Sequence, residues 1–436
     1  MFSKVTGSFC FFISLTYSLF GVLKIPEVEG LDTSAEVRYR ATYFGDFGLY
    51  EKNRMNTSAD EWEHEFRGDL LFKKGRNLLE FRLGHRVQDE DALLDAPEDT
   101  IEQVRQAYLD FSVGALDGLN VRLGRQELSY NRGILLDEND WDMEGNYWDA
   151  VKFYWDGTDW DVDVLYGQLA DEHNNDVAGI NLKRTSERNT VNEFYLWYFG
   201  AEEGNNRIKV SGSPGLEIYN FGTRMEGKLS PELFYHWMVN YQGGEVESGG
   251  ATSDIDAYHF LVNLDYFVDH RIVRNIGVEF TYSSGNDGDT DEMETFIPLY
   301  GDTHTRSGAM DWMSQMNAEI LTLYLFADLH PKVHGLLEYH HFWVNSHDAG
   351  WYLGHLGPAW WGGTPRQNWP TPGAEGAGIS KEVGSEIDLH LQFGNNPNRE
   401  ISFGYSVFFP GNLLQDWDWL KDDVSTWAYL QTDLKF

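Results

Sequence analysis

Apolar and polar residues alternate along short segments of this chain. The last segment, 425–436, places on one side of an extended chain the apolar residues Ala428, Leu430, Leu434 and Phe436, and the residues between them are mostly polar. Since successive side chains of a β-strand point to opposite faces, this pattern predicts a strand with one apolar and one hydrated face. An ordinary edge strand of a soluble sheet would show the same pattern, so the rest of the chain has to decide.

Similar alternating segments follow one another from Ala35 to the C-terminus. We count about 18, an even number within the range of bacterial transmembrane barrels. They lie near residues 37–43, 65–72, 79–84, 107–113, 119–128, 147–155, 160–166, 178–183, 191–199, 216–225, 233–241, 257–267, 276–282, 319–329, 333–344, 385–393, 401–409 and 427–436.

The connections between these segments alternate in length. Every second connection is short and rich in turn-forming residues, at 73–76, 156–159, 186–189, 229–232, 330–332 and 395–398. The intervening connections are longer, and two very long ones lie near 283–317 and 345–381. Short periplasmic turns and long extracellular loops produce this alternation in outer-membrane barrels. We therefore predict an all-β protein, a transmembrane antiparallel up-and-down β-barrel with both chain ends on the periplasmic side.

The composition agrees with a barrel and excludes one class of partner. Aromatic residues make up 15% of the chain and there are 44 glycines. Tyr and Trp suit the bilayer interface, and Gly suits tight turns. The net charge of −37 argues against nucleic acid, whose phosphates require a basic surface. Beyond the N-terminal region no segment is apolar enough for a transmembrane helix, so a membrane protein with this sequence must be a closed barrel in contact with outer-membrane lipid.

The N-terminal region has a pattern of its own. Lys4 is followed by an apolar run over residues 9–23, as in a secretory signal peptide. We expect residues 1–30, approximately, to be a signal peptide and residues 31–436 to be the barrel. The only cysteine, Cys10, lies in the apolar run, so disulfides, cysteine-ligated metals and cysteine nucleophiles are excluded from the mature chain.

Four stretches resemble the alginate export family of outer-membrane β-barrel channels. The first is Gly-Arg-Gln-Glu-Leu-Ser-Tyr at 124–130, followed by Asp140-Trp141 and by 148–151, where the family usually has Phe in place of Trp148. The others are 295–300 with His304, then 381–388, and then 404–411. The resemblance implies an 18-stranded channel that exports an anionic polysaccharide through a narrow charged pore, with periplasmic secretion partners and without catalysis.

A pore for a uronate polymer needs positive side chains to offset the hydration that each carboxylate loses. Alternation along the segments places six basic residues on the inward face: Arg38, Arg40, Arg67, Arg82, Arg86 and Lys152. Arg105 and Arg125 match arginine positions of the family, but alternation places both outward unless a β-bulge reverses their direction. We predict that these eight residues line the pore and contact the substrate.

The charge pattern leaves other substrates open. The inward arginines could simply pair with inward carboxylates such as Glu65, Asp69 and Glu80, as in barrels that transport nothing charged. Further acids on the inward face would repel an anionic polymer if they lined a constriction: Asp161, Asp163, Glu279, Glu386 and Asp388. A neutral or cationic substrate, or a porin function for small solutes, therefore stands as an alternative.

Three other groups of residues give weaker evidence about function. The run 286–292 is rich in oxygen ligands but lacks the spacing of a helix-loop-helix calcium site, so we interpret it as a solvated acidic loop. The long loop holds four tryptophans that could either stack on sugar rings or pack the loop onto itself: Trp351, Trp360, Trp361 and Trp369. His340 and His341 are adjacent in a strand and point to opposite sides, so they cannot hold one metal together.

The search for catalytic groups gives little. Nothing in the pattern brings Ser, His and Asp together, and no Gly-x-Ser-x-Gly elbow or phosphate-binding loop occurs. We therefore expect neither enzymatic activity nor a cofactor or metal. A surface enzyme or a binding protein that works through its long loops is the remaining alternative.

Overall fold

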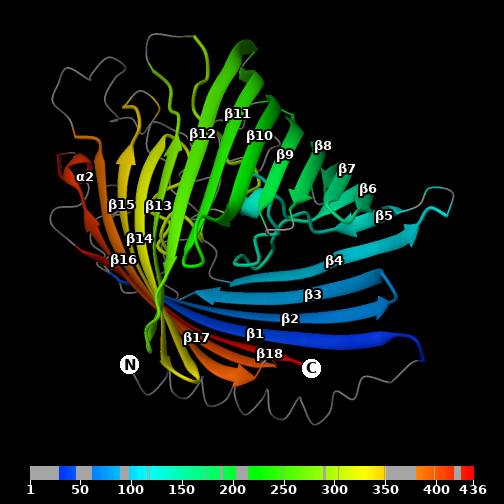
Figure 1. The fold of residues 1–436 in the computed structure, drawn as a ribbon, viewed down its shortest axis with the longest axis horizontal. Helices are drawn as coiled ribbons and strands as arrows, with labels where there is room; N and C mark the ends of the chain where they lie inside the picture. The colour runs from blue at the N-terminus through cyan, green and yellow to red at the C-terminus, as the bar shows by residue number, and fades with distance from the viewer. Residues whose placement is uncertain are drawn as a thin grey trace.

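The computed structural model consists of one antiparallel sheet of 18 strands that closes on itself (Figure 1). The first strand, β1 (Asp32–Gly45), pairs with the last strand, β18 (Ser425–Lys435), from Glu36 opposite Lys435 to Gly45 opposite Thr426. Each of the other strands pairs with its neighbours in the sequence. The predicted up-and-down barrel is confirmed.

The structure describes residues 29–45, 61–88, 98–114, 116, 118–170, 172–186, 190–202, 215–248, 250–287, 291–302, 304–347, 349, 380–396, 398–416 and 424–436. The expected signal peptide lies outside these residues, apart from its last two positions. The four loop tryptophans and part of the acidic run 286–292 also lie outside them.

The remaining elements follow the order of the chain. Within the described residues, the helical elements are the 3-10 turn η2 (Asn131–Gly133) and the short helix α2 (Asn412–Asp416). The strands between β1 and β18 are β2 (Glu61–Lys74), β3 (Asn77–Gln88), β4 (Glu98–Ser112), β5 (Leu119–Gln126), β6 (Trp148–Asp156), β7 (Trp160–Leu169), β8 (Glu172–Thr185), β9 (Val191–Ala201), β10 (Gly215–Lys228), β11 (Leu233–Ser248), β12 (Ala251–Phe267), β13 (Val273–Ser283), β14 (Ala318–His330), β15 (Val333–Val344), β16 (Glu382–Asn396) and β17 (Arg399–Pro410).

The two faces of the sheet differ as the alternation predicts. Along β12, the side chains of Tyr258, Phe260 and Val262 are exposed on the outside, whereas those of His259 and Asn263 are buried on the inside. An apolar outer face and a polar inner face are what a barrel needs to cross a bilayer. Among the described residues, no helix has the length and apolar character required to cross a membrane.

The connections alternate in length with two exceptions. Short turns join the strands at one end of the barrel, and long loops join them at the other end. However, β7 ends at Leu169 and β8 begins at Glu172, and β11 ends at Ser248 and β12 begins at Ala251. The longer loops expected at these two places are wrong. The outward residues there are polar, such as Asp254, whereas the inward residues Leu169 and Ile255 belong to the buried apolar cluster, so the strands lack the apolar outer face by which alternation is recognised.

Two of the long loops fold back into the barrel. The 127–147 loop joins β5 to β6, and the 284–317 loop joins β13 to β14. The two loops are joined by backbone hydrogen bonds, since Tyr300 N donates to Leu135 O and Asp137 N donates to Tyr300 O, both over 3.0 Å. Leu136 and Phe296 are completely buried in one apolar cluster with the barrel wall. The 127–147 loop is therefore held inside the barrel.

Candidate functional site

Three of the arginines expected on the inward face meet at one carboxylate. Arg38 on β1, Arg67 on β2 and Arg82 on β3 lie on neighbouring strands. Their guanidinium nitrogens lie 3.1, 3.0 and 3.4 Å from the carboxylate oxygens of Asp140, in the 127–147 loop. The barrel wall thus supplies the arginines, and the loop that folds inward supplies the carboxylate.

Arg105 is a fourth member of this group because β4 contains a β-bulge. Glu80 faces Gln106 and Phe81 faces Val104 across the β3–β4 pair, so Arg105 is an extra residue on β4. An extra residue reverses the alternation locally, and Arg105 therefore points inward. Its Nη1 lies 3.1 Å from Asp140 Oδ1. We call Arg38, Arg67, Arg82 and Arg105 the arginine cluster.

The backbone of the loop is held at the same place. Nη1 of Arg38 and Nη1 of Arg67 donate to the carbonyl oxygen of Asp140 over 2.9 and 3.0 Å. Arg40 donates to the carbonyl oxygen of Trp141 over 3.0 Å, and its guanidinium lies 4.0 Å from the centre of the Trp141 ring. On this indole the ring of His304, from the 284–317 loop, stacks at 4.0 Å, and Trp427 and Tyr429 of β18 pack against it as well.

The charges of the cluster are nearly balanced. Three carboxylates other than Asp140 form ion pairs with it: Asp433 on β18 at 2.6 Å from Arg38, Asp69 on β2 at 2.7 Å from Arg82, and Glu127 beside Arg105. Four arginines therefore face three fixed carboxylates, and Asp140 supplies the fourth negative charge. The side chain of Asp140 is 43% exposed, whereas those of Arg67 and Arg82 are 2% exposed. Asp140 thus covers the arginines on the side that faces the lumen.

Two carboxyl groups of the loop have perturbed pKa values. Burial alone would raise the pKa of Asp140, but Arg67, Arg38 and Arg105 outweigh it and lower that pKa from 3.8 to about 2. Burial raises the pKa of Glu127 from 4.5 to about 7, although the neighbouring Arg105 opposes this. Asp140 is thus a permanent anion at neutral pH, and Glu127 changes its charge there.

Arg40 and Arg86 share a different carboxylate. Glu65, which is 1% exposed, lies 2.9 Å from Arg40 and 3.4 Å from Arg86. These two arginines share one buried carboxylate, so they continue the row of basic side chains that the arginine cluster forms on the wall of β1, β2 and β3.

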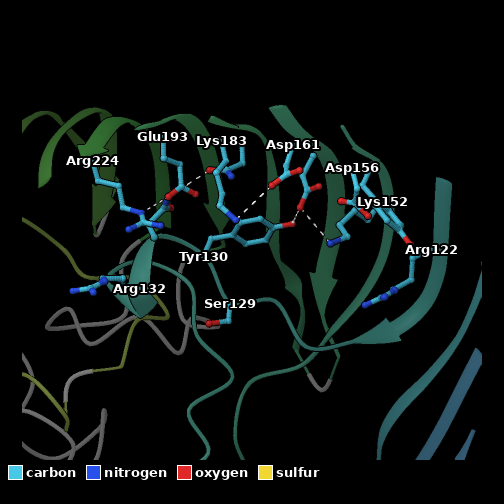
Figure 2. A pocket seen from close by; sticks show the side chains of 14 residues that line it. Arg122, Ser129, Tyr130, Arg132, Lys152, Asp156, Asp161, Lys183, Glu193 and Arg224 are labelled. Carbon is cyan, nitrogen blue, oxygen red and sulfur yellow. Dashed lines mark hydrogen bonds and ion pairs between the residues drawn. The ribbon is translucent and has the colours of Figure 1, made fainter. Parts of the chain in front are cut away.

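Arg125 and Lys152 do not join the arginine cluster. Arg125 shares the outward face of β5 with Leu123 and forms an ion pair with Asp149 of β6 at 2.9 Å. Lys152 points inward and lies 3.3 Å from Asp163 of β7. It lines a separate cavity of about 500 Å³, in which Tyr130 donates to Asp163 over 2.5 Å (Figure 2). Both signs of charge line this cavity: Arg122, Arg132, Lys152, Lys183, Arg224, Asp156, Asp161, Asp163 and Glu193.

The inward acids that could repel an anion contact other groups. Asp161 pairs with Lys183 at 3.5 Å, and Glu279 lies 3.8 Å from Arg306. Glu386 and Asp388 are completely buried and accept hydrogen bonds from the backbone of the 284–317 loop. Within the described residues, none of these carboxylates contacts the arginine cluster.

Sequence reasoning did not assign roles to Asp140, Trp141 and Glu127. A bare Asp-Trp pair in a loop has no periodicity that would place it inside a barrel. The only signal was that Glu127 and Asp140-Trp141 belong to stretches that carry the family resemblance. The structure shows that the second such stretch, 295–300 with His304, packs against the same loop.

Comparisons with known proteins agree with the fold. Residues 30–419 match the family model described as alginate export. No curated protein matches the chain.

Three similar solved structures are of bacterial proteins, and OpdK is described as an outer membrane protein. Pseudomonas aeruginosa OpdK with vanillate is 10% identical, with a TM-score of 0.58 and coverage of 93% of this chain and 98% of OpdK. Pseudomonas aeruginosa OccK2 (OpdF) in complex with glucuronate is 10% identical, with a TM-score of 0.57 and coverage of 94% and 98%. Acinetobacter baumannii OccAB4 is 8% identical, with a TM-score of 0.58 and coverage of 93% and 98%. At these identities the likeness is one of fold.

Proposed function

Since the chain belongs to the alginate export family, and is thus a β-barrel channel of the bacterial outer membrane, we propose that an anionic polysaccharide, or fragments of one, passes through it along the arginine cluster. The family and the fold are those of channels, which are not enzymes. The observation that carries the proposal is the convergence of four guanidinium groups on the single carboxylate of Asp140.

The chemistry of the cluster suits a uronate. Guanidinium groups bind carboxylates through paired N–H donors and are less strongly hydrated than ammonium groups, so they exchange partners at low cost. A sugar carboxylate that enters the lumen loses water and needs such donors in return. Arginines spread over β1 to β4 would let successive carboxylates of one polymer find partners as it moves.

In the absence of substrate, the carboxylate of Asp140 would occupy the position of a substrate carboxylate. Its carboxylate occupies the place that a uronate carboxylate would take, and it sits on a loop rather than on the wall. Without Asp140 the cluster carries four arginines and three carboxylates, a net positive charge that attracts an anion. The incoming polymer would therefore displace the loop carboxylate and open its own path.

A porin function for small solutes is the second candidate. It is favoured by the separate cavity of about 500 Å³, whose lining carries both signs of charge and suits no single class of ion. Under this alternative the arginines would only hold the 127–147 loop in place. In either case outer-membrane lipid surrounds the barrel, and export of a polymer would also need periplasmic partners.

Single-channel recording separates the two candidates. The wild-type barrel in a planar bilayer is expected to prefer anions and to be blocked by trigalacturonate, an oligomer of uronic acid, but not by neutral maltotriose. Arg67→Gln or Arg82→Gln should lower the anion preference and weaken the block. Cation preference in the wild type, or high conductance without block by trigalacturonate, would contradict the anionic-substrate proposal and favour the porin.

Arg125→Gln is the matched control. It removes the same charge, but from the outward face, where Arg125 pairs with Asp149. We expect its selectivity and block to equal those of the wild type. Folding of each variant is checked by its resistance to SDS without heating, so a selectivity change cannot arise from a misfolded barrel.

A further inference from the structure

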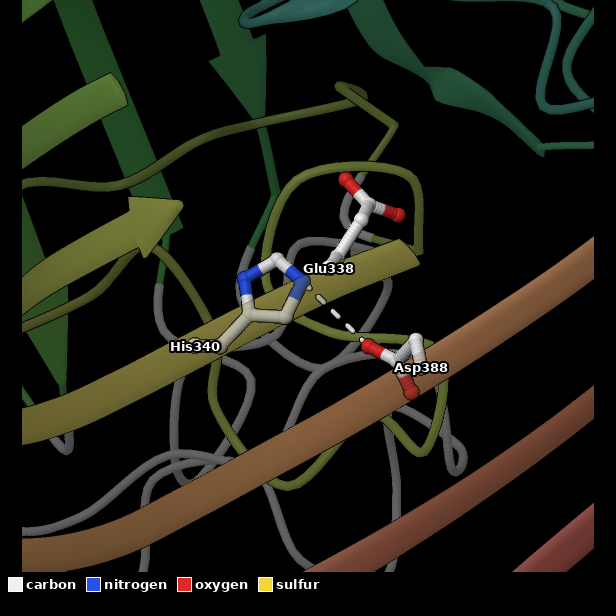
Figure 3. A group of neighbouring side chains, drawn as sticks. All are labelled: Glu338, His340 and Asp388. Atoms are coloured by element: carbon white, nitrogen blue, oxygen red, sulfur yellow. Dashed lines mark ion pairs between the residues drawn. The ribbon is translucent and has the colours of Figure 1, made fainter. Parts of the chain in front are cut away.

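A second group of polar side chains lies on the inner wall at β15 and β16. Glu338 lies directly opposite Asp388 across this strand pair. His340 follows Glu338 by two residues and therefore shares its face. His340 is aimed at Asp388, and Glu338 lies beside this pair (Figure 3). One nitrogen or oxygen atom from each of them lies within 4.8 Å of the other two.

The imidazole of His340 is held in a fixed orientation. Its Nδ1 forms a hydrogen bond of 2.9 Å with the hydroxyl of Thr322 on β14. Its Nε2 lies 3.2 Å from Asp388 Oδ2, but the two atoms do not have hydrogen-bond geometry. Histidines that bind a metal through one ring nitrogen usually have the other ring nitrogen held by a hydrogen bond. Here Thr322 holds Nδ1, which leaves Nε2 as the nitrogen that could bind a metal.

The group carries an excess of negative charge. Glu386 lies beside Asp388 on the same face of β16, so three carboxylates surround one imidazole. Backbone N–H groups of Ala309 and Met310 donate to Asp388 and Glu386 over 3.4 and 2.8 Å. Among the residues that the structure describes, neither Lys nor Arg forms an ion pair with these carboxylates. The nearest basic groups are the imidazoles of His340, 3.2 Å from Asp388, and His390, 3.9 Å from Glu338. Buried ionised carboxylates without a cation are costly, so the compensating charge must come from a protonated imidazole, a shared proton or a bound cation.

Three buried polar atoms of the group have unused hydrogen-bonding capacity. His340 Nε2, Asp388 Oδ1 and Glu386 Oε2 have no hydrogen-bond partner within the described part of the chain. His340 is 2% exposed and Asp388 is not exposed at all. A single cation between His340 and Asp388 would supply positive charge and a partner for both the lone pair of the imidazole and the carboxylate of Asp388.

We propose that Glu338, His340 and Asp388 bind a divalent first-row transition-metal ion, with Zn²⁺ as the best match. Imidazole nitrogen favours Zn²⁺ over Ca²⁺ or Mg²⁺, which prefer oxygen ligands only. Zn²⁺ holds such ligands at about 2.0–2.2 Å, so two of them stand roughly 3.3 Å apart on one ion. The observed separation of His340 Nε2 and Asp388 Oδ2, 3.2 Å, fits that value. The Glu338 side chain is 19% exposed and provides the path of entry from the lumen.

The competing explanation is a shared proton. A proton between Glu386 and Asp388, together with a protonated His340, would also reduce the charge without any metal. The two explanations differ in the role of Glu338. A metal ion would need Glu338 as a ligand, whereas the shared proton involves only Glu386, Asp388 and His340. The test therefore depends on Glu338 as well as on His340.

The test uses the full-length barrel, without a histidine tag, folded in detergent and stripped with a chelator. Zn²⁺ is then titrated calorimetrically at pH 7, and bound metal is counted after gel filtration. Co²⁺ is added to a separate sample, where a d–d absorption band reports nitrogen and oxygen ligands. We expect one equivalent of Zn²⁺ in the wild type, at least about 10-fold weaker binding in Glu338→Gln, and loss of the site and of the Co²⁺ band in His340→Gln.

His341→Gln is the matched control, because His341 is the adjacent residue and points to the opposite side of β15, 3.4 Å from Glu382. Its Zn²⁺ binding should equal that of the wild type. A folded wild-type barrel that retains no Zn²⁺ would overturn the proposal in favour of the shared proton. Equal binding by all four proteins, or binding of Ca²⁺ in preference to Zn²⁺, would overturn it as well. Glu338→Gln keeps the test valid if His340→Gln fails to fold.

Discussion

Replacing Asp140 with Asn would keep the shape of the side chain and remove its charge. In the structure this carboxylate neutralises the arginine cluster from the lumen side, while two wall carboxylates, Asp69 and Asp433, and Glu127 at the start of the loop remain in place. If Asp140 competes with a uronate for the same guanidinium groups, the neutral side chain competes less well. An anionic oligomer should then bind more tightly to Asp140→Asn than to the wild type.

The size of the effect follows from the pKa of Asp140. The cluster lowers this pKa from 3.8 to about 2, a difference that corresponds to about 2.5 kcal/mol in favour of the charged form. The side chain is 43% exposed, so solvent screening reduces the usable interaction to about 1 kcal/mol. Losing about 1 kcal/mol of competition corresponds to roughly fivefold tighter binding of the competitor. Because the lowered pKa means that this interaction is lost only as the pH falls from 3.8 through about 2, the wild type should show no change from Asp140 between pH 5 and pH 8.

The assay is a titration of single-channel block with trigalacturonate at pH 7. We expect the half-blocking concentration to fall about fivefold in Asp140→Asn, and the difference to shrink at high salt. Asp161→Asn is the control, because this carboxylate pairs with Lys183 in the separate cavity. An unchanged or higher half-blocking concentration in Asp140→Asn would refute the idea that the loop carboxylate holds the place of a substrate carboxylate.

Three further outcomes are expected. Glu127, whose pKa is raised to about 7, should lose its charge between pH 8 and pH 6 and so release Arg105 from its ion pair. The anion preference, measured from reversal potentials, should therefore be greater at pH 6 than at pH 8. Glu127→Gln should abolish this pH dependence. Trp141→Ala removes the contacts with Arg40 and His304 that hold the 127–147 loop, so single-channel recordings should show a larger and noisier conductance; an unchanged trace would mean that other contacts suffice. Glu65→Gln leaves Arg40 and Arg86 without their buried carboxylate and should destabilise the barrel by about 3 kcal/mol, measured as a lower temperature for loss of SDS resistance.

Period-two alternation was sufficient to predict the strands and the inward direction of Arg38, Arg67 and Arg82. It failed for Arg105, because a β-bulge adds one residue and has no signature in the hydrophobic pattern. It also failed where β7, β8, β11 and β12 extend beyond the apolar band, since the outward residues are polar there and the apolar ones, such as Leu169 and Ile255, face inward onto the folded loops. Alternation placed Arg125 outward, and the structure agrees; its inclusion among the predicted pore residues came from the family pattern alone.

The central role of Asp140 could not have been predicted from local sequence. Its position depends on how the 127–147 loop packs against the 284–317 loop, through contacts between residues that lie far apart in the chain, such as Leu135 and Tyr300. The same holds for the group at His340. The sequence showed two adjacent histidines that diverge, and only strand pairing brings Asp388 to one of them. Sites that are built between elements need the register of those elements, which sequence patterns do not supply.

The pairing of Arg38 on β1 with Asp433 on β18 joins the first and the last strand of the sheet. One edge of the arginine cluster is therefore contributed by the last strand of the sheet. A chain in which β1 and β18 have not yet paired lacks both a closed barrel wall and the complete arginine cluster with its carboxylates. The barrel would then close and acquire its ion selectivity in the same step. A partly assembled barrel would form no open pore, and the outer membrane would stay impermeable during assembly.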